Sequence, residues 1–351
     1  MAGGGEAGRR AAPGVSQVFI VLATREPHAA LLERQLASLS AQTLRDWTGV
    51  VVDDASGDAS LQAIRERVAR EPRLRLIQHA DHVGYYRNFE RGLAMVPATC
   101  RYVALCDQDD YWAPDKLAWQ VAALKARPEA RLCYTDLRLV DPGGSVLAES
   151  FWELRPHGRS FREVLYNNVV TGTTALFCRE LLDPALPFPD DPGGAFHDHW
   201  LALCSMASGG LMYLDEPLVD YTQHAGSVIG AQGLEHSGRG AVARLLGEPL
   251  RQTVLNLKEL ARRLDELAAH AARAEARLRS LATALRARVH GLPPEASKAL
   301  RPFLRRHRSI RVLDLAFPTL LGSLAAREET NLEPLKISLG LTWGALRRRK
   351  I

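Results

Sequence analysis

Residues 17–24 read QVFIVLAT, a largely apolar run in which half of the side chains are β-branched. Such a run is typical of a strand buried on both faces of a sheet. Residues 29–42 follow it, and their leucines recur at the spacing of one helix face: Leu31, Leu32, Leu36 and Leu39. The start of the chain therefore predicts a strand followed by a helix.

The same alternation continues toward residue 106. Further strands are predicted at 47–52, 74–78 and 102–106, and further helices at 59–69 and 86–95. Repeated alternation predicts an α/β fold with a doubly wound, mostly parallel sheet. Ligands of such sheets bind beyond the carboxyl ends of the strands. Thr24, Asp53 and Asp107 fall at such ends, so we expect them to cluster at one edge.

The pattern after Trp112 is mixed. Residues 132–134 and 137–140 predict two short strands flanking a bend, and DPGG at 141–144 predicts a hairpin turn. An apolar strand is expected at 173–178 and a helix at 196–206.

Composition bounds the class of protein. The 351 residues are 46% hydrophobic and 24% charged, which is typical of one sizeable α/β domain with an appendage or of two modest domains. The net charge of +5 is mild, and much of the excess lies near the C-terminus. No nucleic-acid partner is predicted from it.

Cellular location is predicted from cysteines and apolar runs. The five cysteines form no CxxC pair, which favours free thiols in a reducing compartment. Residues 1–13 contain no apolar secretory run, and no window of about twenty residues lacks charge. We therefore expect a cytoplasmic protein without a spanning helix.

An acidic loop, CDQDDYW at 106–112, follows a buried strand. Asp107 and Asp109 stand two residues apart, so both carboxylates can address one hard cation that also binds diphosphate oxygens. Mg²⁺ or Mn²⁺ held this way would neutralise a leaving nucleoside diphosphate. The alternative is a solvated turn. The preceding strand and the following Tyr-Trp favour the metal interpretation.

A second acidic pair closes the strand at 47–52. Carboxylates at the positions of Asp53 and Asp54 commonly accept hydrogen bonds from a ribose hydroxyl or a base N–H. The alternative is an Asx-turn that stabilises the loop DDASGD.

Four stretches together resemble a known family: VFIVLATRE, VVDDASGD, GYYRNFERGL and CDQDDYWAPDKL. In this order and spacing they are similar to family-2 glycosyltransferases of the GT-A fold. CDQDDYW with NFERGL resembles the rhamnosyltransferase-like members that build bacterial cell-surface polysaccharides. The resemblance covers roughly residues 16–230.

The resemblance implies an inverting transfer from a nucleoside-diphosphate sugar. Thr24, Asp53 and Asp54 match positions that hold the nucleoside, while Arg87 and Asn88 match positions near the base or ribose. Asp107 matches the diphosphate and metal site, and Asp109 the direct metal ligand. The residues carried over as donor or metal ligands are Thr24, Asp53, Asp54, Arg87, Asn88, Asp107 and Asp109.

Asp198, in FHDHW at 196–200, matches the catalytic base of the family. A helix N-terminus would keep its carboxylate ionised, as a general base requires. His197 and His199 predict no zinc site, since alternate helical residues do not share a face. His224 matches a motif histidine that completes the metal shell or touches a phosphate, and a structural histidine is the alternative. Thr222 replaces the arginine common in that motif, which puts a diphosphate contact there in doubt.

The resemblance favours dTDP-rhamnose as donor, with UDP-sugars as the alternative, and a saccharide or lipid-linked acceptor. Trp112, Trp152 and Trp200 are candidates for stacking on a sugar ring, or are core residues.

The domain boundaries follow from these limits. We expect a disordered leader at 1–15, a GT-A domain at 16–235 and a helical extension at 236–351. A Leu/Ala seam at 257–285 predicts a helix that packs on its own domain or forms a homo-oligomer. The basic and apolar tail indicates peripheral contact with the inner face of the cell membrane, or a solvated basic face.

Two rival functions remain at this point. A nucleotidyltransferase should have a glycine-rich phosphate loop after the first strand, but VLATREPHAA contains no glycine. A catalytically degenerate GT-A subunit, serving as a sugar-binding or scaffold protein, is disfavoured by the presence of Asp107, Asp109 and Asp198.

Overall fold

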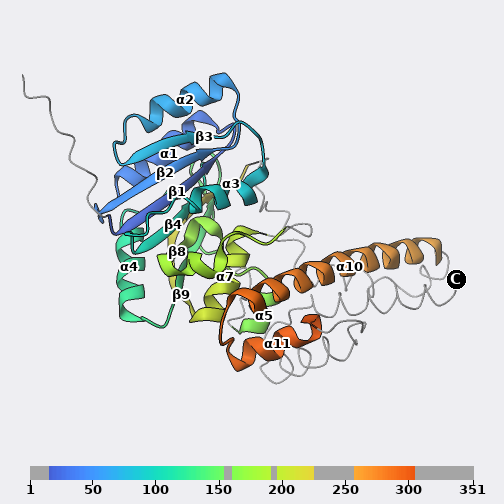
Figure 1. Cartoon of the computed structure of the whole chain (residues 1–351). Helices are drawn as coiled ribbons and strands as arrows, with labels where there is room; N and C mark the ends of the chain where they lie inside the picture. The colour runs from blue at the N-terminus through green and yellow to red at the C-terminus, as the bar shows by residue number, and fades with distance from the viewer. Residues whose placement is uncertain (1–15, 154–159, 191–195, 225–256, 305–351) are drawn as a thin grey trace, which may run out of the picture.

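The computed structural model of the chain describes residues 16–153, 160–190, 196–224 and 257–304. Within these ranges the centre of the molecule is a nine-stranded mixed sheet with the order β3-β2-β1-β4-β8-β6-β9-β5, and β7 pairs with β6. Helices flank the sheet, and a long helix extends away from it (Figure 1).

The first half of the sheet is parallel, as predicted. Its elements are β1 (Val18–Thr24), α1 (Ala29–Ser40), β2 (Trp47–Asp53), α2 (Asp58–Val68), β3 (Leu74–Gln78), α3 (Gly84–Leu93) and β4 (Tyr102–Cys106). β1 pairs in parallel with both β2 and β4, and β2 pairs in parallel with β3.

The second half mixes directions. Its elements are β5 (Tyr111–Trp112), α4 (Lys116–Ala126), β6 (Leu132–Val140), β7 (Val146–Ala148), α5 (Phe161–Tyr166), β8 (Ala175–Cys178), α6 (Leu182–Ala185), α7 (His197–Ser208) and β9 (Leu211–Thr222), with short 3₁₀ turns at Gly172–Thr174 and Arg179–Leu181. β8 is antiparallel to β4 and β6, whereas β9 is parallel to β6.

The structure departs from the sequence predictions for this half at two points. The predicted bend between residues 134 and 137 is a register irregularity inside the single strand β6, at Thr135 and Asp136. β9 was not predicted, because Asp215, Glu216 and Pro217 in its middle are residues that strands disfavour. Pro217 pairs with Asp136 at that irregularity, so the break in the regular pairing of β6 accommodates the proline of β9.

The sheet is covered on both faces by apolar cores. In β1, Val18, Ile20 and Leu22 join a core with α1 and α4. Phe19 and Val21 point to the opposite core, which includes α3, α5, α7, α10 and α11. Burial on both faces is what the continuous apolar run predicted.

Close packing of α3 on β1 and β2 depends on Gly92. A Cβ at this position would lie 2.4 Å from Val21 Cγ1 and 3.1 Å from Val52 Cγ2. Since both valines are fully buried, Gly92→Ala should lower the free energy of unfolding by about 1–3 kcal/mol. Urea denaturation measures this. Gly210→Ala, whose Cβ would meet its nearest atoms at 3.7 Å, is the control and should change stability little. Equal stability of both variants would contradict this account of the packing.

The C-terminal helices pack on the domain at one end. They are α10 (Leu257–Arg288) and α11 (Pro294–Leu304). Leu278, Leu281 and Leu285 of α10 are buried in the core shared with α5 and α7. The second half of the predicted seam therefore packs on its own domain.

The other predictions for the ends of the chain lie outside the described residues. These include the side chains of Leu257 to Leu267, the leader at 1–15 and the basic tail beyond 304. Among the described helices, none has the length and apolar character needed to cross a membrane.

Candidate active site

The predicted site residues meet at one edge of the sheet. Thr24 pairs with Asp53 in the parallel register of β1 and β2, and Leu22 pairs with Cys106, which precedes Asp107. Their expected clustering at the carboxyl ends of the strands is thus confirmed. Gln108 links the acidic loop to the end of β1: its Oε1 accepts from the Arg25 backbone N–H at 2.8 Å, and its Nε2 donates to the Arg25 carbonyl at 3.2 Å.

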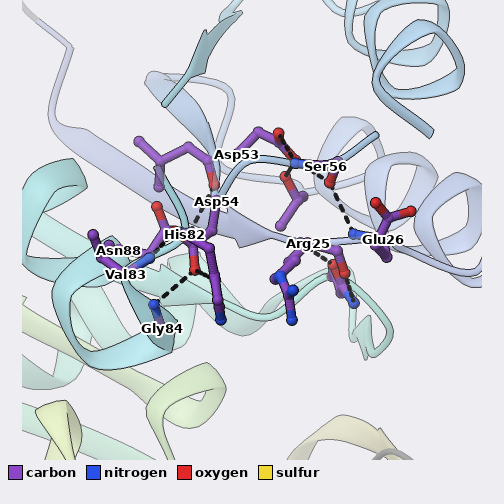
Figure 2. A network of polar contacts seen from close by, with 12 residues as sticks. Arg25, Glu26, Asp53, Asp54, Ser56, His82, Val83, Gly84 and Asn88 are labelled. Carbon is purple, nitrogen blue, oxygen red and sulfur yellow. Dashed lines mark hydrogen bonds and ion pairs between the residues drawn. The ribbon is translucent and has the colours of Figure 1, made fainter. Parts of the chain in front are cut away.

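The Asp53 carboxylate is held inside the protein by three donors. Thr24 Oγ1 donates to Oδ1 at 3.1 Å, Ser56 Oγ to Oδ1 at 2.6 Å and the Ser56 N–H to Oδ2 at 2.9 Å (Figure 2). The two bonds from Ser56 agree with the alternative interpretation of DDASGD, an Asx-turn that stabilises the loop. The nucleoside role of Thr24 and Asp53 stays a prediction.

Asp54 ties the end of β2 to the start of α3. The backbone N–H groups of Val83 and Gly84 donate to its carboxylate at 2.8 and 2.9 Å, and His82 Nδ1 lies 2.7 Å from Oδ2 (Figure 2). Asp54 therefore satisfies amides that the α3 helix itself leaves unpaired. In Figure 2 the side chains of His82 and Arg25, both exposed, extend in the same direction.

The loops after β1 and β2 contain strained backbone. Glu26 has a φ of 42° and Ala55 a φ of 59°, in a backbone region that residues other than glycine rarely adopt. Glu26 is fixed there by its own N–H, which donates to Ser56 Oγ at 2.8 Å, and by its Oε1, which accepts from the Gly57 N–H at 2.6 Å. Strained residues of this kind gather at ligand sites.

Arg87 and Asn88 make contacts within the protein. Asn88 is buried and its Nδ2 donates to the Val52 carbonyl at 2.9 Å. Arg87 contacts Glu90 at 2.6 Å and donates to the Phe188 carbonyl at 3.2 Å. These bonds attach α3 to β2 and to the segment before α7. A role of either residue near a base or ribose stays a prediction.

Carboxylates crowd the acidic loop. Burial, and then the charge of Asp109, raise the pKa of both Asp107 and Asp110. Gly172 donates to Asp198, and its neighbour Thr173 accepts from Trp112 at the end of the acidic loop, so the candidate base stands near the same cluster. The charge of Asp198 also raises the pKa of Asp107. Asp110, fully buried with its Oδ1 accepting from the Thr222 N–H at 3.1 Å, was not singled out from the sequence.

The end of β9 returns to this loop and brings His224 to Asp109. His224 Nε2 lies 2.8 Å from Asp109 Oδ2. Thr222 Oγ1 donates to the Asp109 carbonyl at 2.6 Å, and Arg34 donates to the same carbonyl at 3.2 Å and to the Thr222 hydroxyl. The sequence did not indicate Arg34, because it lies within a predicted helix far from the acidic loop in the chain.

The donor set of this loop fits a divalent cation. Asp109 and His224 present a carboxylate oxygen and an imidazole nitrogen to each other, and both atom types bind Mn²⁺ or Mg²⁺. Among the described residues, no three His, Cys, Asp or Glu side chains are placed to hold a metal by themselves. Mg²⁺-type sites commonly combine one or two carboxylates with substrate phosphates. The remaining ligands would then come from a bound diphosphate and water.

Asp198 begins α7 as a buried carboxyl group with three donors. Asn168 Nδ2 and the His199 N–H donate to Oδ1 at 2.8 and 2.7 Å, and the Gly172 N–H donates to Oδ2 at 2.9 Å. Burial raises its pKa to about 7, while the hydrogen bonds lower it. The helix start was expected to keep this carboxylate ionised. With burial outweighing these donors, its ionisation near neutral pH depends on the pH.

The two histidines beside Asp198 have different neighbours. His197 stacks on Phe89, with ring centroids 3.9 Å apart. His199 Nε2 lies 2.6 Å from the Val164 carbonyl. Burial lowers the pKa of His197 to about 3 and that of His199 to about 4, so both rings are neutral near pH 7.

The tryptophans proposed for sugar stacking are mostly core residues. Trp112 and Trp200 are 0% exposed, so the stacking interpretation was wrong for these two. Their indole N–H groups donate to Thr173 Oγ1 at 3.0 Å and to the Ala185 carbonyl at 2.9 Å. Trp152 is partly buried against the core.

The family described as Glycosyl transferase family 2 matches residues 18–184, which contain the acidic loop and the strand ends just described. This stretch, just under half of the chain, is similar to family-2 glycosyltransferases. The match ends before α7 and β9, which contribute Asp198 and lead to His224.

Relatives and solved structures agree with this assignment. An uncharacterized protein of Mycobacterium tuberculosis (strain H37Rv) is 31% identical over 179 residues, 50% of each chain. The O-antigen biosynthesis protein RfbC of Myxococcus xanthus is 33% identical over 137 residues, 38% of this chain and 10% of that protein. The chain thus spans about half the length of the first relative and a tenth of the second.

Among solved structures, S. aureus TarS 1–349 in complex with UDP superposes with a TM-score of 0.50 at 16% identity, covering 95% of this chain and 92% of that one. At this identity the likeness concerns the fold. The curled sheet with helices on both faces is the GT-A fold that the sequence predicted.

Proposed function

We propose that the chain is an inverting glycosyltransferase that moves a sugar from a nucleoside diphosphate to a saccharide or lipid-linked acceptor in cell-surface polysaccharide biosynthesis. One observation carries the proposal: a buried carboxyl group with a pKa of about 7, Asp198, stands near the Asp107 to Asp109 loop of a family-2 domain. A base with a pKa close to the working pH is best suited to proton transfer.

In this proposal Asp198 acts on the acceptor. Its ionised carboxylate accepts the proton of an acceptor hydroxyl as the hydroxyl oxygen forms a bond to the anomeric carbon of the donor. The bond from that carbon to the diphosphate breaks with its electron pair, and the nucleoside diphosphate leaves. The configuration at the anomeric carbon is inverted, and the proton remains on Asp198. Asn168 and Gly172 orient the carboxylate for this step.

The acidic loop would serve the leaving group. Asp109 would hold a divalent cation, Mg²⁺ or Mn²⁺, together with Asp107 and His224. When bound, such a cation neutralises charge that develops on a leaving diphosphate. Gln108 and Arg34 keep the loop in place through their bonds to the Arg25 backbone and to the Asp109 carbonyl.

The nucleoside would lie over the ends of β1 and β2. Thr24, Asp53, Asp54, Arg87 and Asn88 are the residues proposed for this role from the resemblance. The strained loops after both strands and the exposed side chains of Arg25 and His82 support a ligand there. L-Rhamnose from dTDP-rhamnose is the proposed sugar, and UDP-sugars are the alternative.

Further proposals concern the rest of the chain. We infer that residues 16–235 form the catalytic unit and residues 236–351 a helical extension. The extension is proposed to support homo-oligomers or peripheral contact with the inner membrane face of a cytoplasmic protein. Leu278 and Leu281 pack on the domain, so a partner helix would have to contact other residues than these.

A donor screen tests the proposed reaction. The full chain is incubated with dTDP-rhamnose or UDP-sugars and Mn²⁺, and release of nucleoside diphosphate is measured. We expect dTDP-rhamnose to give the fastest release, EDTA to abolish it and added Mn²⁺ to restore it. Release that EDTA leaves unchanged would contradict the metal site. A chain that binds these donors without releasing any nucleoside diphosphate would be the degenerate, sugar-binding subunit.

A further inference from the structure

One exposed aromatic side chain borders the candidate site. Tyr85, in the first turn of α3, is 42% exposed, and its ring stacks on Phe196 with centroids 5.9 Å apart and planes inclined by 26°. The other exposed large apolar side chains of the described residues are Trp119 on α4 and Val146 and Leu147 on β7. Tyr85 differs from these because it lies close to candidate site residues. It follows Gly84, which donates to Asp54, and its ring contacts Phe196, two residues before Asp198.

The stacked pair connects the two sides of the site. Tyr85 directly follows Gly84, whose N–H donates to Asp54 at 2.9 Å in the network at the end of β2 (Figure 2). Phe196 directly precedes α7 and stands two residues before Asp198. The two rings therefore lie between the proposed nucleoside side and the proposed base.

A polar group without a partner lies next to this pair. The His197 ring is 6.2 Å from the Tyr85 ring and inclined to it by 64°. Within the described part of the chain, neither ring nitrogen of His197 has a hydrogen-bond partner, although the residue is only 6% exposed. A neutral imidazole offers one donor and one acceptor, and leaving both unpaired is costly. Because both nitrogens are themselves buried, His197 contributes to this part of the site through its ring, which packs beside Tyr85 and on Phe89.

Resting on the proposed function, we propose that Tyr85 and Phe196 form the aromatic wall of an acceptor subsite, against which the apolar face of a pyranose ring stacks. The acceptor hydroxyl must come within hydrogen-bond distance of the base. Because Phe196 and Asp198 are two residues apart at the start of one helix, a sugar ring that reaches Asp198 passes beside the stacked pair. Aromatic rings gain favourable contact from apolar faces, and tyrosine tolerates a wet edge.

The test separates acceptor binding from nucleotide binding. Saturation-transfer NMR detects binding of methyl α-L-rhamnoside, methyl α-D-glucoside and methyl α-D-mannoside to the full chain with and without dTDP and Mn²⁺. Calorimetry measures dTDP binding to the same samples. The variants are Tyr85→Ala and Tyr85→Phe. The matched control is Trp119→Ala, which removes an aromatic side chain of similar exposure on α4.

We expect at least one methyl glycoside to bind the wild-type chain, Tyr85→Phe and Trp119→Ala. Binding to Tyr85→Ala should weaken by about fivefold or more, since one stacking contact is lost, while dTDP affinity stays within about twofold. Circular dichroism checks that Tyr85→Ala folds. If it does not fold, Tyr85→Phe still tests the proposal. This variant keeps the ring, so it must bind the glycoside as wild type does, and a loss of binding would contradict stacking on the ring.

Three results would overturn the subsite. One is no glycoside binding by a wild-type chain that binds dTDP, another is equal glycoside binding by Tyr85→Ala, and the third is a loss of dTDP affinity in that variant, which would assign Tyr85 to the nucleotide. A wild-type chain that binds a glycoside but neither dTDP nor UDP would instead overturn the proposed transferase function. The glycoside measurement without nucleotide would still decide the subsite.

Discussion

Replacing Asp198 with asparagine should lower turnover of the sugar nucleotide by about 10²–10⁴-fold, the usual contribution of a general base. The amide keeps the size of the side chain but cannot accept the acceptor proton. Release of nucleoside diphosphate in the presence of acceptor measures the effect. Asp183→Asn, which changes an exposed carboxylate paired with Arg179 on α6, is the control and should keep full turnover.

Stability distinguishes this loss from misfolding. Burial raises the pKa of Asp198 to about 7 in the folded chain, from an ordinary value of 3.8. The folded state therefore binds more protons than the unfolded state between these values, and stability falls as pH rises through about 7. Asp198→Asn removes the titrating group, so the stability of the variant in urea should not fall between about pH 4 and pH 7 as that of wild type does. A variant whose stability falls with pH as steeply as that of wild type would contradict the buried-carboxylate account.

The pH profile should also respond to Asn168. With wild type, kcat/KM should rise with pH and level off above about 7, where Asp198 is ionised. Asn168→Ala removes a donor that stabilises the ionised form, so its rising limb should move to higher pH with a similar plateau. Full turnover by Asp198→Asn, or a profile that Asn168→Ala leaves in place, would assign the base to another group.

The first half of the fold could be predicted because local pattern and tertiary role coincide there. The run from Val18 to Leu22 is apolar on both faces, and the structure buries both. The positions of Thr24, Asp53 and Asp107 followed as well, because parallel strands end at one edge. β9 could not be predicted, since its register depends on the irregularity of β6 opposite Pro217.

What each site residue contacts was much harder to predict than where it lies. Asp54 was expected at a ligand, and the structure shows that it accepts from the amides at the start of α3. Arg34 reaches the Asp109 carbonyl across 75 residues of sequence, and no periodic pattern encodes such a contact. Tyr85 could not be singled out from the sequence, because the sequence does not show that its side chain is exposed while those of Trp112 and Trp200 are buried.

Asp109→Asn should weaken Mn²⁺-dependent binding of dTDP or UDP by at least about 10–100-fold, the loss expected on removing part of a metal shell. Turnover should fall by on the order of 10³-fold, since neutralising a leaving diphosphate is worth several kcal/mol. Isothermal calorimetry with and without Mn²⁺ measures binding, and donor turnover measures the rate. Asp115→Asn changes an exposed carboxylate of the same segment, bonded to Thr43 Oγ1 at 2.7 Å, and should leave both unchanged.

His224→Ala then decides between the two interpretations of that histidine. Its ring lies 2.8 Å from Asp109 Oδ2, which suits both a shared metal ligand and a side chain that only orients the carboxylate. As a ligand, it should lower Mn²⁺-dependent nucleotide affinity together with turnover, and raised Mn²⁺ should restore part of both. As an orienting residue, it should lower turnover at saturating Mn²⁺ with little change in metal affinity. Nucleotide binding independent of Mn²⁺ in wild type and in Asp109→Asn alike would contradict the metal site itself, because without a cation the carboxylates of Asp107 and Asp109 would repel a bound diphosphate.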